Sequence, residues 1–314
     1  MLFYCIKRIG LGLFIVALAV TLLFCMIHMV PGDPARIILG PRATPELLAS
    51  FSAQMGLDKP LLVQIALFFG NLLQGDMGMD IVTKRSVASI VFGQLPYTLS
   101  LIGAAIVFAI LLGVPLGCYS ALNRNSIGDR ITGILSVACI TVPAFVVALY
   151  SLLIFAVALR WFPAVGAGES GDFWDQVYHL VLPAFAIGLS WVGYLARLVR
   201  ASMLEVLNEN HIRTARAYGL PERVIVYRYA LKLAILPTVT VIGVAMGFLL
   251  SGALFTEIVF ARPGIGKLIF DSITTRNYPV VMGAVVVSTV LFVISTTLSD
   301  VINAWLDPRI RASL

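Results

Sequence analysis

Charged residues are scarce in this sequence. Asp, Glu, Lys and Arg make up 12% of its 314 residues, whereas hydrophobic residues make up 60%. That charged share is about half of what soluble proteins have, and the mean hydropathy is +0.97. Because a soluble fold could not remove so much apolar surface from water, the composition excludes an ordinary soluble domain. It predicts an all-α polytopic membrane protein.

Cysteine and histidine offer little for redox or metal chemistry. The cysteines form no CxxC pair and lie in or beside apolar runs, so we expect them to be small buried hydrophobic residues. The histidines do not stand at the spacing of a metal-binding pair, and the sequence predicts no metal site. The residues concerned are Cys5, Cys25, Cys118 and Cys139, and His28, His179 and His211.

Motifs of catalysis and nucleotide binding are absent as well. The sequence has neither HExxH nor GxSxG, and the run Gly10-Leu11-Gly12 lacks the third glycine of a dinucleotide fingerprint. The glycines between Arg262 and Lys267 do not have the spacing of a phosphate loop. No nucleophile stands out with a base beside it. We therefore predict no catalytic residue and no cofactor bound by this chain.

Six long apolar runs make up most of the sequence. Because a bilayer core needs about 20 helical residues, each run is a predicted membrane span, and the fourth is the shortest. Lys7 and Arg8 precede the first run, and no small-residue cleavage pattern follows before Pro31, so we predict an uncleaved span there. The six runs are Ile9–Val30, Tyr97–Leu122, Ile131–Leu159, Leu180–Leu195, Leu236–Phe255 and Val280–Leu298.

The six runs contain prolines and glycines but no Asp, Glu, Lys or Arg, and charged side chains begin at their edges, as at Glu257 and Asp300. Ion-driven carriers usually have ionisable groups near the midplane, so this pattern argues against a proton-coupled pump. Prolines permit bends, and closely spaced small residues let helices approach. The helices are either ordinarily packed or bent around a path that opens and closes. The candidate gating or kink positions are Pro115, Pro143, Pro183 and Pro237, and the small positions are Gly113 with Gly117, Gly188, and Gly243 with Gly247.

The distribution of charge predicts the orientation. If the N-terminus is cytosolic, 13 of the 22 basic residues and six of the 16 acidic residues lie on the inner side. The net charge is then +7 inside and −1 outside. Basic residues concentrate on the cytoplasmic side of membrane proteins, so both termini are predicted to be cytosolic.

The first outer loop, residues 31–96, is too long for a simple connection and is predicted to be a small, mainly helical insertion. Thr44 is a plausible N-cap followed by Pro45 and Glu46. A second helix is predicted from Leu61 to Leu73, ended by the glycines that follow. The insertion either covers the spans or offers a surface to an outer partner.

The stretch from Asn208 to Pro221 is the most polar long segment between apolar runs. Its alanines favour a helix, Asn208 or Asn210 can cap the start, and Gly219 stands where a left-handed residue is wanted at the end. Pro221 can then open the next helix. The segment is either a solvated loop or a docking helix for a soluble partner.

This segment resembles the cytoplasmic EAA loop of ABC-transporter permeases. The resemblance rests on His211–Leu220, followed by Ala230-Leu231-Lys232 and Leu236-Pro237. It is closest to the dipeptide, oligopeptide and nickel importer branch and extends over essentially the whole chain. Other motifs similar to that branch are Pro31–Pro34, Gly56–Pro60, Gly75–Gly78, Arg262–Gly266, Asn277–Val280 and Asp307–Arg311.

The sequence departs from the broader family pattern at three places. Aligned on Gly219, Arg213 stands where the broader motif has an acidic residue, and Leu236-Pro237 lie further along the chain than in the general motif. Both features resemble the peptide and nickel branch. Arg262 stands where that branch often has an aromatic residue before Pro263.

The resemblance implies a type I ABC importer permease fold with six transmembrane helices. The implied organisation is a first span with its cytosolic tip in 1–30, an outer insertion in 31–96, and a five-span core in 97–314 that contains a cytoplasmic coupling loop, 199–235. The implied partners are a second permease, two ATP-binding subunits that carry ATP and Mg, and a periplasmic or lipoprotein substrate-binding protein. Nucleic acid is not among them. The implied location is the bacterial cytoplasmic membrane.

The resemblance also implies roles for individual residues. ATPase coupling is implied for His211, Arg213, Thr214, Ala215, Arg216, Ala217, Gly219 and Leu220. Docking of the binding protein is implied for Asp33, Asp58, Asp76, Arg262, Gly264 and Gly266.

The substrate stays open at this stage. Dipeptides, oligopeptides and glutathione are implied by the branch, and nickel or a metallophore is the alternative within it. A passive channel or a membrane scaffold is the alternative from a different class. Uptake that strictly requires ATP would separate an importer from a channel, and a scaffold would pass no solute.

Overall fold

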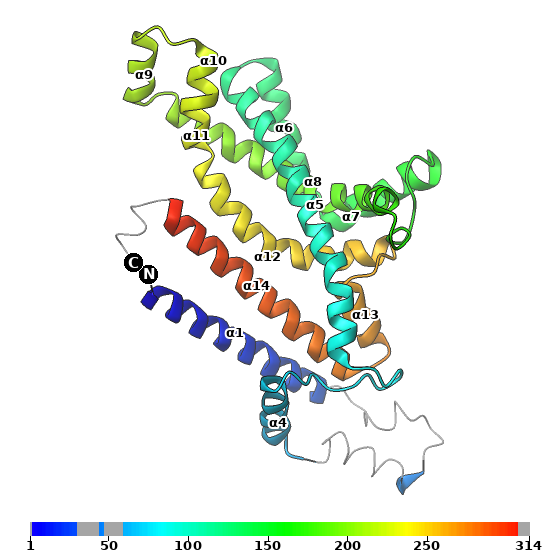
Figure 1. Cartoon of the computed structure of the whole chain (residues 1–314). Helices are drawn as coiled ribbons and strands as arrows, with labels where there is room; N and C mark the ends of the chain where they lie inside the picture. Colours follow the sequence, from blue (N-terminus) through cyan, green and yellow to red (C-terminus); the bar gives the residue numbers. More distant parts are fainter. Residues whose placement is uncertain (1, 30–43, 47–58, 307–314) are drawn as a thin grey trace. The chain divides into compact units, whose positions relative to one another are not determined.

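The computed structural model describes residues 2–29, 44–46 and 59–306 of the chain, which are drawn in colour in Figure 1. Regular structure in this part is helical, with one isolated bridge between Met79 and Ser86. Five helices are long and apolar enough to cross a membrane, and six if one bent pair counts as a single span. The predicted all-α membrane fold is confirmed.

The chain divides into two compact units. One consists of Met1–Pro96 with Gly264–Val293, and the other of Tyr97–Pro263 with Ile294–Leu314. Two long helices, α5 (Val87–Leu122) and α14 (Tyr278–Leu306), contribute residues to both units. Each unit is described by itself below.

The first unit packs α1, α4 and the start of α14 around a small apolar core. Val20 of α1 is buried with Met282 and Val286 of α14, and Phe24 of α1 meets Phe68 of α4 edge to face, with ring centroids 5.6 Å apart. A second core lies between the start of α5, α13 and α14. The remaining helices of this unit are α1 (Leu2–Met29), α4 (Leu61–Leu73) and α13 (Ile265–Thr274).

Within the predicted insertion, residues 31–96, the second predicted helix is present, whereas residues 87–96 belong to helix α5. Helix α4 begins and ends at the predicted residues, Leu61 and Leu73, because Pro60 cannot continue a preceding helix and the residues after Leu73 favour a turn. The predicted first helix of the insertion lies mostly outside the described residues.

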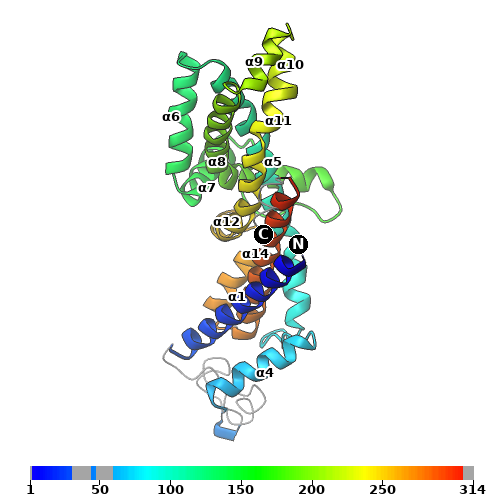
Figure 2. The same cartoon turned by 90° about the vertical axis from the view of Figure 1, so that its left-hand side faces the viewer.

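The second unit is built around helix α8. Helices α6, α7 and α12 pack against α8, as Figures 1 and 2 show from two directions. In the most apolar stretch of α8, 56% of the residues are buried, whereas the other long apolar helices have at most 39% buried in the corresponding stretch. Helix α8 is therefore the central helix of this unit. The elements are α6 (Ile127–Thr141), α7 (Ala144–Ser151), η1 (Leu152–Ala158), α8 (Phe173–Val206), α9 (Asn210–Ala217), α10 (Glu222–Val224), η2 (Ile225–Ala230), α11 (Leu231–Ala234) and α12 (Leu236–Val259).

Glycines bring α5 and α8 close together. A Cβ atom added at Gly117 would lie 2.5 Å from the carbonyl oxygen of Ala196, and one at Gly113 would lie 2.9 Å from the Cβ of Leu195. A Cβ atom added at Gly188 of α8 would lie 2.9 Å from the carbonyl oxygen of Ala105 of α5. These distances leave no room for a side chain, which is how small residues let membrane helices approach.

The third predicted span is broken. The sequence predicted one span over Ile131–Leu159, whereas α6 ends at Thr141 and the helix that begins at Ala144 is turned by 98°. Pro143 stands at the break with φ −59° and ψ 139°. Proline supplies no backbone N–H and disfavours helical geometry in the residue before it, and Val142 is extended here, with φ −78° and ψ 123°.

The other candidate kink prolines lie in different settings. Pro115 and Pro183 stand inside the continuous helices α5 and α8, and Pro183 is buried. Pro237 lies in the first turn of α12, where the missing N–H has no partner in a helix anyway. Of the four, Pro143 is the one that stands between two separate helices.

Helix α8 is much longer than the fourth predicted span, Leu180–Leu195. Its 34 residues extend about 51 Å at 1.5 Å per residue, so the helix exceeds a bilayer core. The hydropathy pattern detected only the apolar middle. Arg200, which lies in the cytoplasmic loop 199–235 implied by the sequence, is part of the final two turns of α8.

Candidate coupling site

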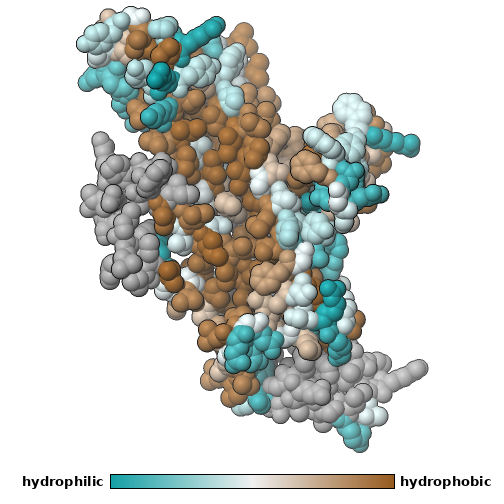
Figure 3. Space-filling view, in the orientation of Figure 1, coloured by the Kyte–Doolittle hydropathy of each residue, from teal (hydrophilic) through white to brown (hydrophobic). Residues whose placement is uncertain are grey.

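Helix α9 is a short amphipathic helix at one end of the second unit. Ile212 and Ala215 are three residues apart and therefore face the same side, and both are buried. The opposite face is polar and exposed, and hydrophilic side chains gather at this end in Figure 3. The exposed residues are His211, Arg213, Thr214, Arg216, Ala217 and Tyr218.

The buried face of α9 belongs to an apolar cluster that reaches deep into the unit, which we call the α9 cluster. Ile212 and Ala215 pack in it with residues of α5, α8, η2 and α11. Burial of such side chains is the main force that keeps a helix of this length folded. Helix α9 thus contacts η2 and is joined through the cluster to α5, α8 and α11. The other buried members are Val114, Cys118, Ala121, Val199, Met203, Val206, Ile225, Val226, Ala230 and Ala234.

The end of α9 is closed by a Schellman motif. Gly219 has φ +74°, and its N–H donates to the carbonyl of Arg216 at 2.9 Å, while the N–H of Leu220 donates to the carbonyl of Ala215 at 3.3 Å. This pair of bonds needs a left-handed residue, for which glycine has no steric cost. The predicted role of Gly219 as a helix stop is confirmed.

The start of α9 differs from the prediction. Neither Asn208 nor Asn210 caps it: Glu209 stands at the N-cap without a capping side-chain bond. The amide of Asn208 instead donates to the carbonyl of Leu204 at 2.7 Å, at the end of α8. The Asn208 side chain thus bonds to the C-terminal end of α8. The sequence alone does not show which of the two helices a polar residue between them will cap.

An ion pair connects α9 to α10. The guanidinium of Arg216 lies 2.8 Å from the carboxylate of Glu222, and this hydrogen bond lowers the pKa of Glu222 below its ordinary value. Both side chains are about half exposed, and exposed pairs contribute little stability. The pair orients the Arg216 side chain on the outward face of α9.

The predicted coupling residues divide into two groups. Ala215 is buried and Leu220 is half-buried in the α9 cluster, so these two side chains hold α9 in place. The other six lie on the exposed face or at the glycine stop. Tyr218 was not among the predicted contacts, yet it is 83% exposed. The sequence signal that could have identified Tyr218 is its place as an aromatic residue shortly after three basic residues, His211, Arg213 and Arg216.

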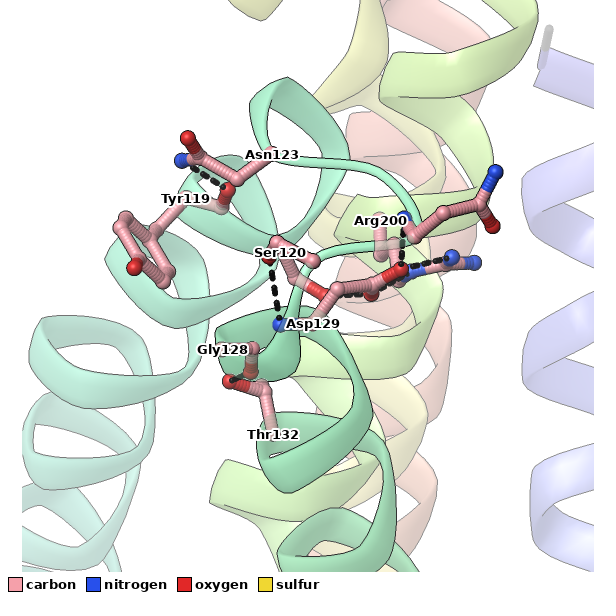
Figure 4. Close-up of polar contacts among 9 residues, drawn as sticks. Tyr119, Ser120, Asn123, Gly128, Asp129, Thr132 and Arg200 are labelled. Atoms are coloured by element: carbon pink, nitrogen blue, oxygen red, sulfur yellow. Dashed lines mark hydrogen bonds and ion pairs between the residues drawn. The ribbon is translucent and has the colours of Figure 1, made fainter.

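A buried carboxylate joins α6 to α8 beside the α9 cluster (Figure 4). Arg200 donates from Nε to Oδ1 of Asp129 at 2.6 Å and from Nη2 to Oδ2 at 2.8 Å. The hydroxyl of Ser120 donates to Oδ1 at 2.5 Å, and the N–H of Asn125 to Oδ2 at 2.9 Å. Ser126 caps α6 by accepting from the N–H of Asp129. The sequence gave no signal for the pairing of Asp129 with Arg200, since 71 positions separate them.

A second charged group lies in the same unit, where α12 ends. Glu257 is fully buried inside α12 and accepts from the hydroxyl of Thr98 at 2.6 Å. Arg262 is 3% exposed and its Nη2 lies 3.3 Å from the hydroxyl of Ser100. Burial lowers the pKa of Arg262, and the charge of Glu257 opposes that shift. The contacts tie the end of α12 to α5.

Of the four described residues that are implied in docking, three are not on the surface. Arg262, Gly264 and Gly266 are buried in the single chain, whereas Asp76 is exposed and accepts from the N–H of Gly78 at 2.8 Å. Their docking role stays a prediction, with Asp76 the described residue that offers a side chain to a partner. Asp33 and Asp58 lie outside the described residues.

The described residues hold no group of three or more His, Cys, Asp or Glu side chains that could bind a metal ion. His179 pairs with Asp175 at 3.2 Å and His211 with Glu209 at 3.0 Å. Each of these histidines therefore has an acidic neighbour close in the chain, His179 in a half-buried position and His211 in an exposed one.

Two sequence models of protein families match the chain. One is described as the binding-protein-dependent transport system inner membrane component and matches residues 113–312. The other is described as the N-terminal part of a binding-protein-dependent transport system membrane component and matches residues 1–102.

Full-length relatives are similar along the whole chain. The dipeptide transport system permease protein DppB of Alkalihalophilus pseudofirmus is 36% identical over 332 residues, covering 99% of this chain and 100% of the relative. The glutathione transport system permease proteins GsiC of Shigella flexneri and of Escherichia coli K12 are each 38% identical over 314 residues, covering 99% of both chains.

A solved structure shares the fold. It is the inward-facing MetNI methionine ABC transporter, with a TM-score of 0.55 over 69% of this chain and 96% of that one. At 16% sequence identity this likeness concerns the fold alone.

Proposed function

The chain belongs to the family of binding-protein-dependent transport system inner membrane components and is a permease subunit of an ABC importer, and we propose that it admits short peptides with energy received through α9. The observation that carries this proposal is the two-sided character of α9. One face is basic and exposed, and the other is buried in the α9 cluster with α5, α8, η2 and α11. A subunit that binds the exposed face would therefore act on the helices that meet in this cluster.

Two ATP-binding subunits are the proposed partners on the cytosolic side. ATP and Mg would be bound there, and this chain would carry no catalytic group. Arginine forms directional pairs with carboxylates, so Arg213 and Arg216 are suited to acidic groups on an ATPase surface. Tyr218 adds an amphipathic side chain of a kind common in protein interfaces. Closure of the ATPases on ATP would displace α9 and, with it, the bent helices.

A second homologous permease is proposed to complete the path. A substrate-binding protein would dock on the outer side, where Asp76 is exposed. Both termini are proposed to be cytosolic, in the cytoplasmic membrane of a bacterium. The basis is the charge distribution of the sequence together with six crossings, the number obtained if α6 and α7 form one span.

The proposed cargo is a short peptide. Relatives that match along the whole chain are named as dipeptide and glutathione permeases, and both solutes are peptide-like. Nickel or a metallophore is the alternative within the same branch. Selection between these cargos would depend largely on the outer binding protein.

The first test is purification of the tagged chain in mild detergent, followed by identification of the proteins that accompany it. We expect a second permease and ATP-binding subunits. A chain that is recovered alone and conducts solute without ATP would refute the proposed assembly and favour a passive channel.

The cargo is tested with the reconstituted assembly in vesicles. Labelled glutathione, a labelled dipeptide and Ni²⁺ are compared for accumulation with and without ATP. ATP-dependent accumulation of a peptide would support the proposal, whereas accumulation of Ni²⁺ alone would replace the peptide by the metal.

A further inference from the structure

The end of α5, the start of α6 and the last part of α8 meet at one carboxylate. Asp129 receives two bonds from Arg200 of α8, one from Ser120 of α5 and one from the turn at Asn125. We call Asp129 with Arg200 the α6–α8 clasp. A two-pronged contact between a guanidinium and a carboxylate fixes orientation as well as distance. The three segments are therefore held in one arrangement at this point (Figure 4).

The clasp lies next to the part of α8 that holds α9. Val199 and Met203 flank Arg200 along α8, and both are fully buried in the α9 cluster with Ile212 of α9. These two side chains of α8 thus belong to the apolar cluster that holds α9, and the Arg200 side chain between them is bonded to Asp129. A displacement of α9 reaches Arg200 through the packing of this cluster.

Helix α5 is held at this end of the unit by packing in the α9 cluster, whereas α6 is held there by the clasp. Helix α5 contributes buried residues to the α9 cluster, whereas the buried members of that cluster include none from α6. Further along, α6 contacts α8 where Gly193 approaches Ser136. At its first turn, α6 is held to α8 by the clasp. The other end of α6 leads into the 98° bend at Pro143.

We propose that Asp129 and Arg200 are positioning residues that transmit the displacement of α9 to α6 and so to the bend at Pro143. This rests on the proposed function, in which an ATPase moves α9. Without the clasp, α8 still moves with α9, but the first turn of α6 loses its direct bond to α8 and follows only through the packing further along, around Gly193 and Ser136. The coupling between ATP binding and the α6–α7 bend then weakens.

The test uses the complete importer, purified with its ATPase subunits and placed in lipid discs. An environment-sensitive dye is attached to one introduced cysteine after the natural cysteines have been replaced. Glu205→Cys reports on α8 and Ile127→Cys reports on the start of α6, and both positions are exposed. The dye emission is recorded without nucleotide and with ATP and Mg²⁺, so the readout needs no knowledge of the cargo.

In the importer with an unaltered clasp, ATP is expected to change the dye emission at both labelled positions. In Asp129→Asn and in Arg200→Met the change at Glu205→Cys should persist, while the change at Ile127→Cys should fall about two- to thirtyfold. Because each partner acts through the other, the double variant should be no worse than the more affected single variant. Arg200→Lys keeps the charge but loses the fork and should also weaken the response.

Controls separate this role from simple stability. Asp271→Asn makes the same chemical change in an exposed pair with Lys267 in α13, and it should leave both responses as they are. A response at Ile127→Cys that stays normal in the clasp variants, or that falls in step with the response at Glu205→Cys, would overturn the clasp proposal alone. An importer with an intact clasp in which neither dye responds to ATP would overturn the proposed coupling as well.

Discussion

At the residue scale, Gly219 gives the most direct test of coupling. Its φ of +74° is unfavourable for a β-branched side chain by about 1–3 kcal/mol, although open space surrounds a Cβ there. Gly219→Val should therefore distort the end of α9, uncouple ATP hydrolysis from uptake and leave the chain in the membrane. ATPase rate, uptake and membrane abundance are measured together.

The matched variant is Gly219→Asn, because asparagine tolerates left-handed geometry. It should retain most of the coupling. Normal uptake by Gly219→Val would remove the assignment of α9 as the coupling helix.

The surroundings of Asp80 predict a local dependence of stability on pH. Burial would raise its pKa, but hydrogen bonds from Thr83, Asn277 and the N–H groups of Val82 and Thr83 together lower it below its ordinary value. A carboxylate with a lowered pKa in the folded state stabilises that state above the unfolded pKa, about 4, and loses the effect as the pH falls through the folded pKa.

Hydrogen exchange at the Val82 and Thr83 amides measures this effect. After correction for intrinsic rates, protection should be constant above about pH 5 and should fall below about pH 4. Asp80→Asn should lower local stability by about 1–3 kcal/mol and remove the dependence on pH. Identical pH profiles in the two proteins would contradict the role of the carboxylate.

At the element scale, the close packing of α5 on α8 determines which glycines can be changed. Gly117→Ala should destabilise the protein by about 1–3 kcal/mol, because the new methyl group would meet the backbone of Ala196 and the side chain of Val199. Thermal unfolding of the purified chain in detergent measures the loss.

The same substitution elsewhere in α5 is the control. No heavy atom of the described residues beyond its own helix lies within 4 Å of a Cβ built at Gly103. Replacing a helical glycine by alanine gains about 0.5–1 kcal/mol, so Gly103→Ala should be neutral or stabilising. An equal loss in both variants would show that contact with α8 does not limit position 117.

At the scale of the whole molecule, the broken pair of α6 and α7 decides the topology. If the pair crosses the membrane, there are six spans and both termini lie on one side. If the pair enters and leaves by the same face, there are five crossings and the termini lie on opposite sides. We expect the first arrangement from the charge distribution.

Labelling of single cysteines with an impermeant reagent distinguishes the two arrangements. Arg124→Cys precedes the pair and Ser170→Cys follows it, and both positions are exposed. We expect Arg124→Cys to react only from the cytosolic side and Ser170→Cys only from the outer side. Reaction of both from one side would mean that the pair is a re-entrant loop.

Several features follow from the sequence alone because they depend on neighbouring residues. Apolar runs predicted the spans, the residues around Leu61–Leu73 predicted α4, and the alanines with Gly219 predicted α9 and its end. Each depends on local composition and backbone preference, which a short window of sequence contains. Pro143 was the available signal for the bend in the sequence, whereas its angle of 98° is known only from the structure.

The tertiary structure decided which of these elements touch. It placed Ala215 in the α9 cluster, buried Arg262, and brought Arg200 to Asp129. It also continued α8 beyond its apolar part, because contacts with neighbouring helices compensate for polar residues that a hydropathy pattern treats as loop. Such contacts join residues far apart in the chain. Their energies arise only when the helices pack, so no local pattern records them.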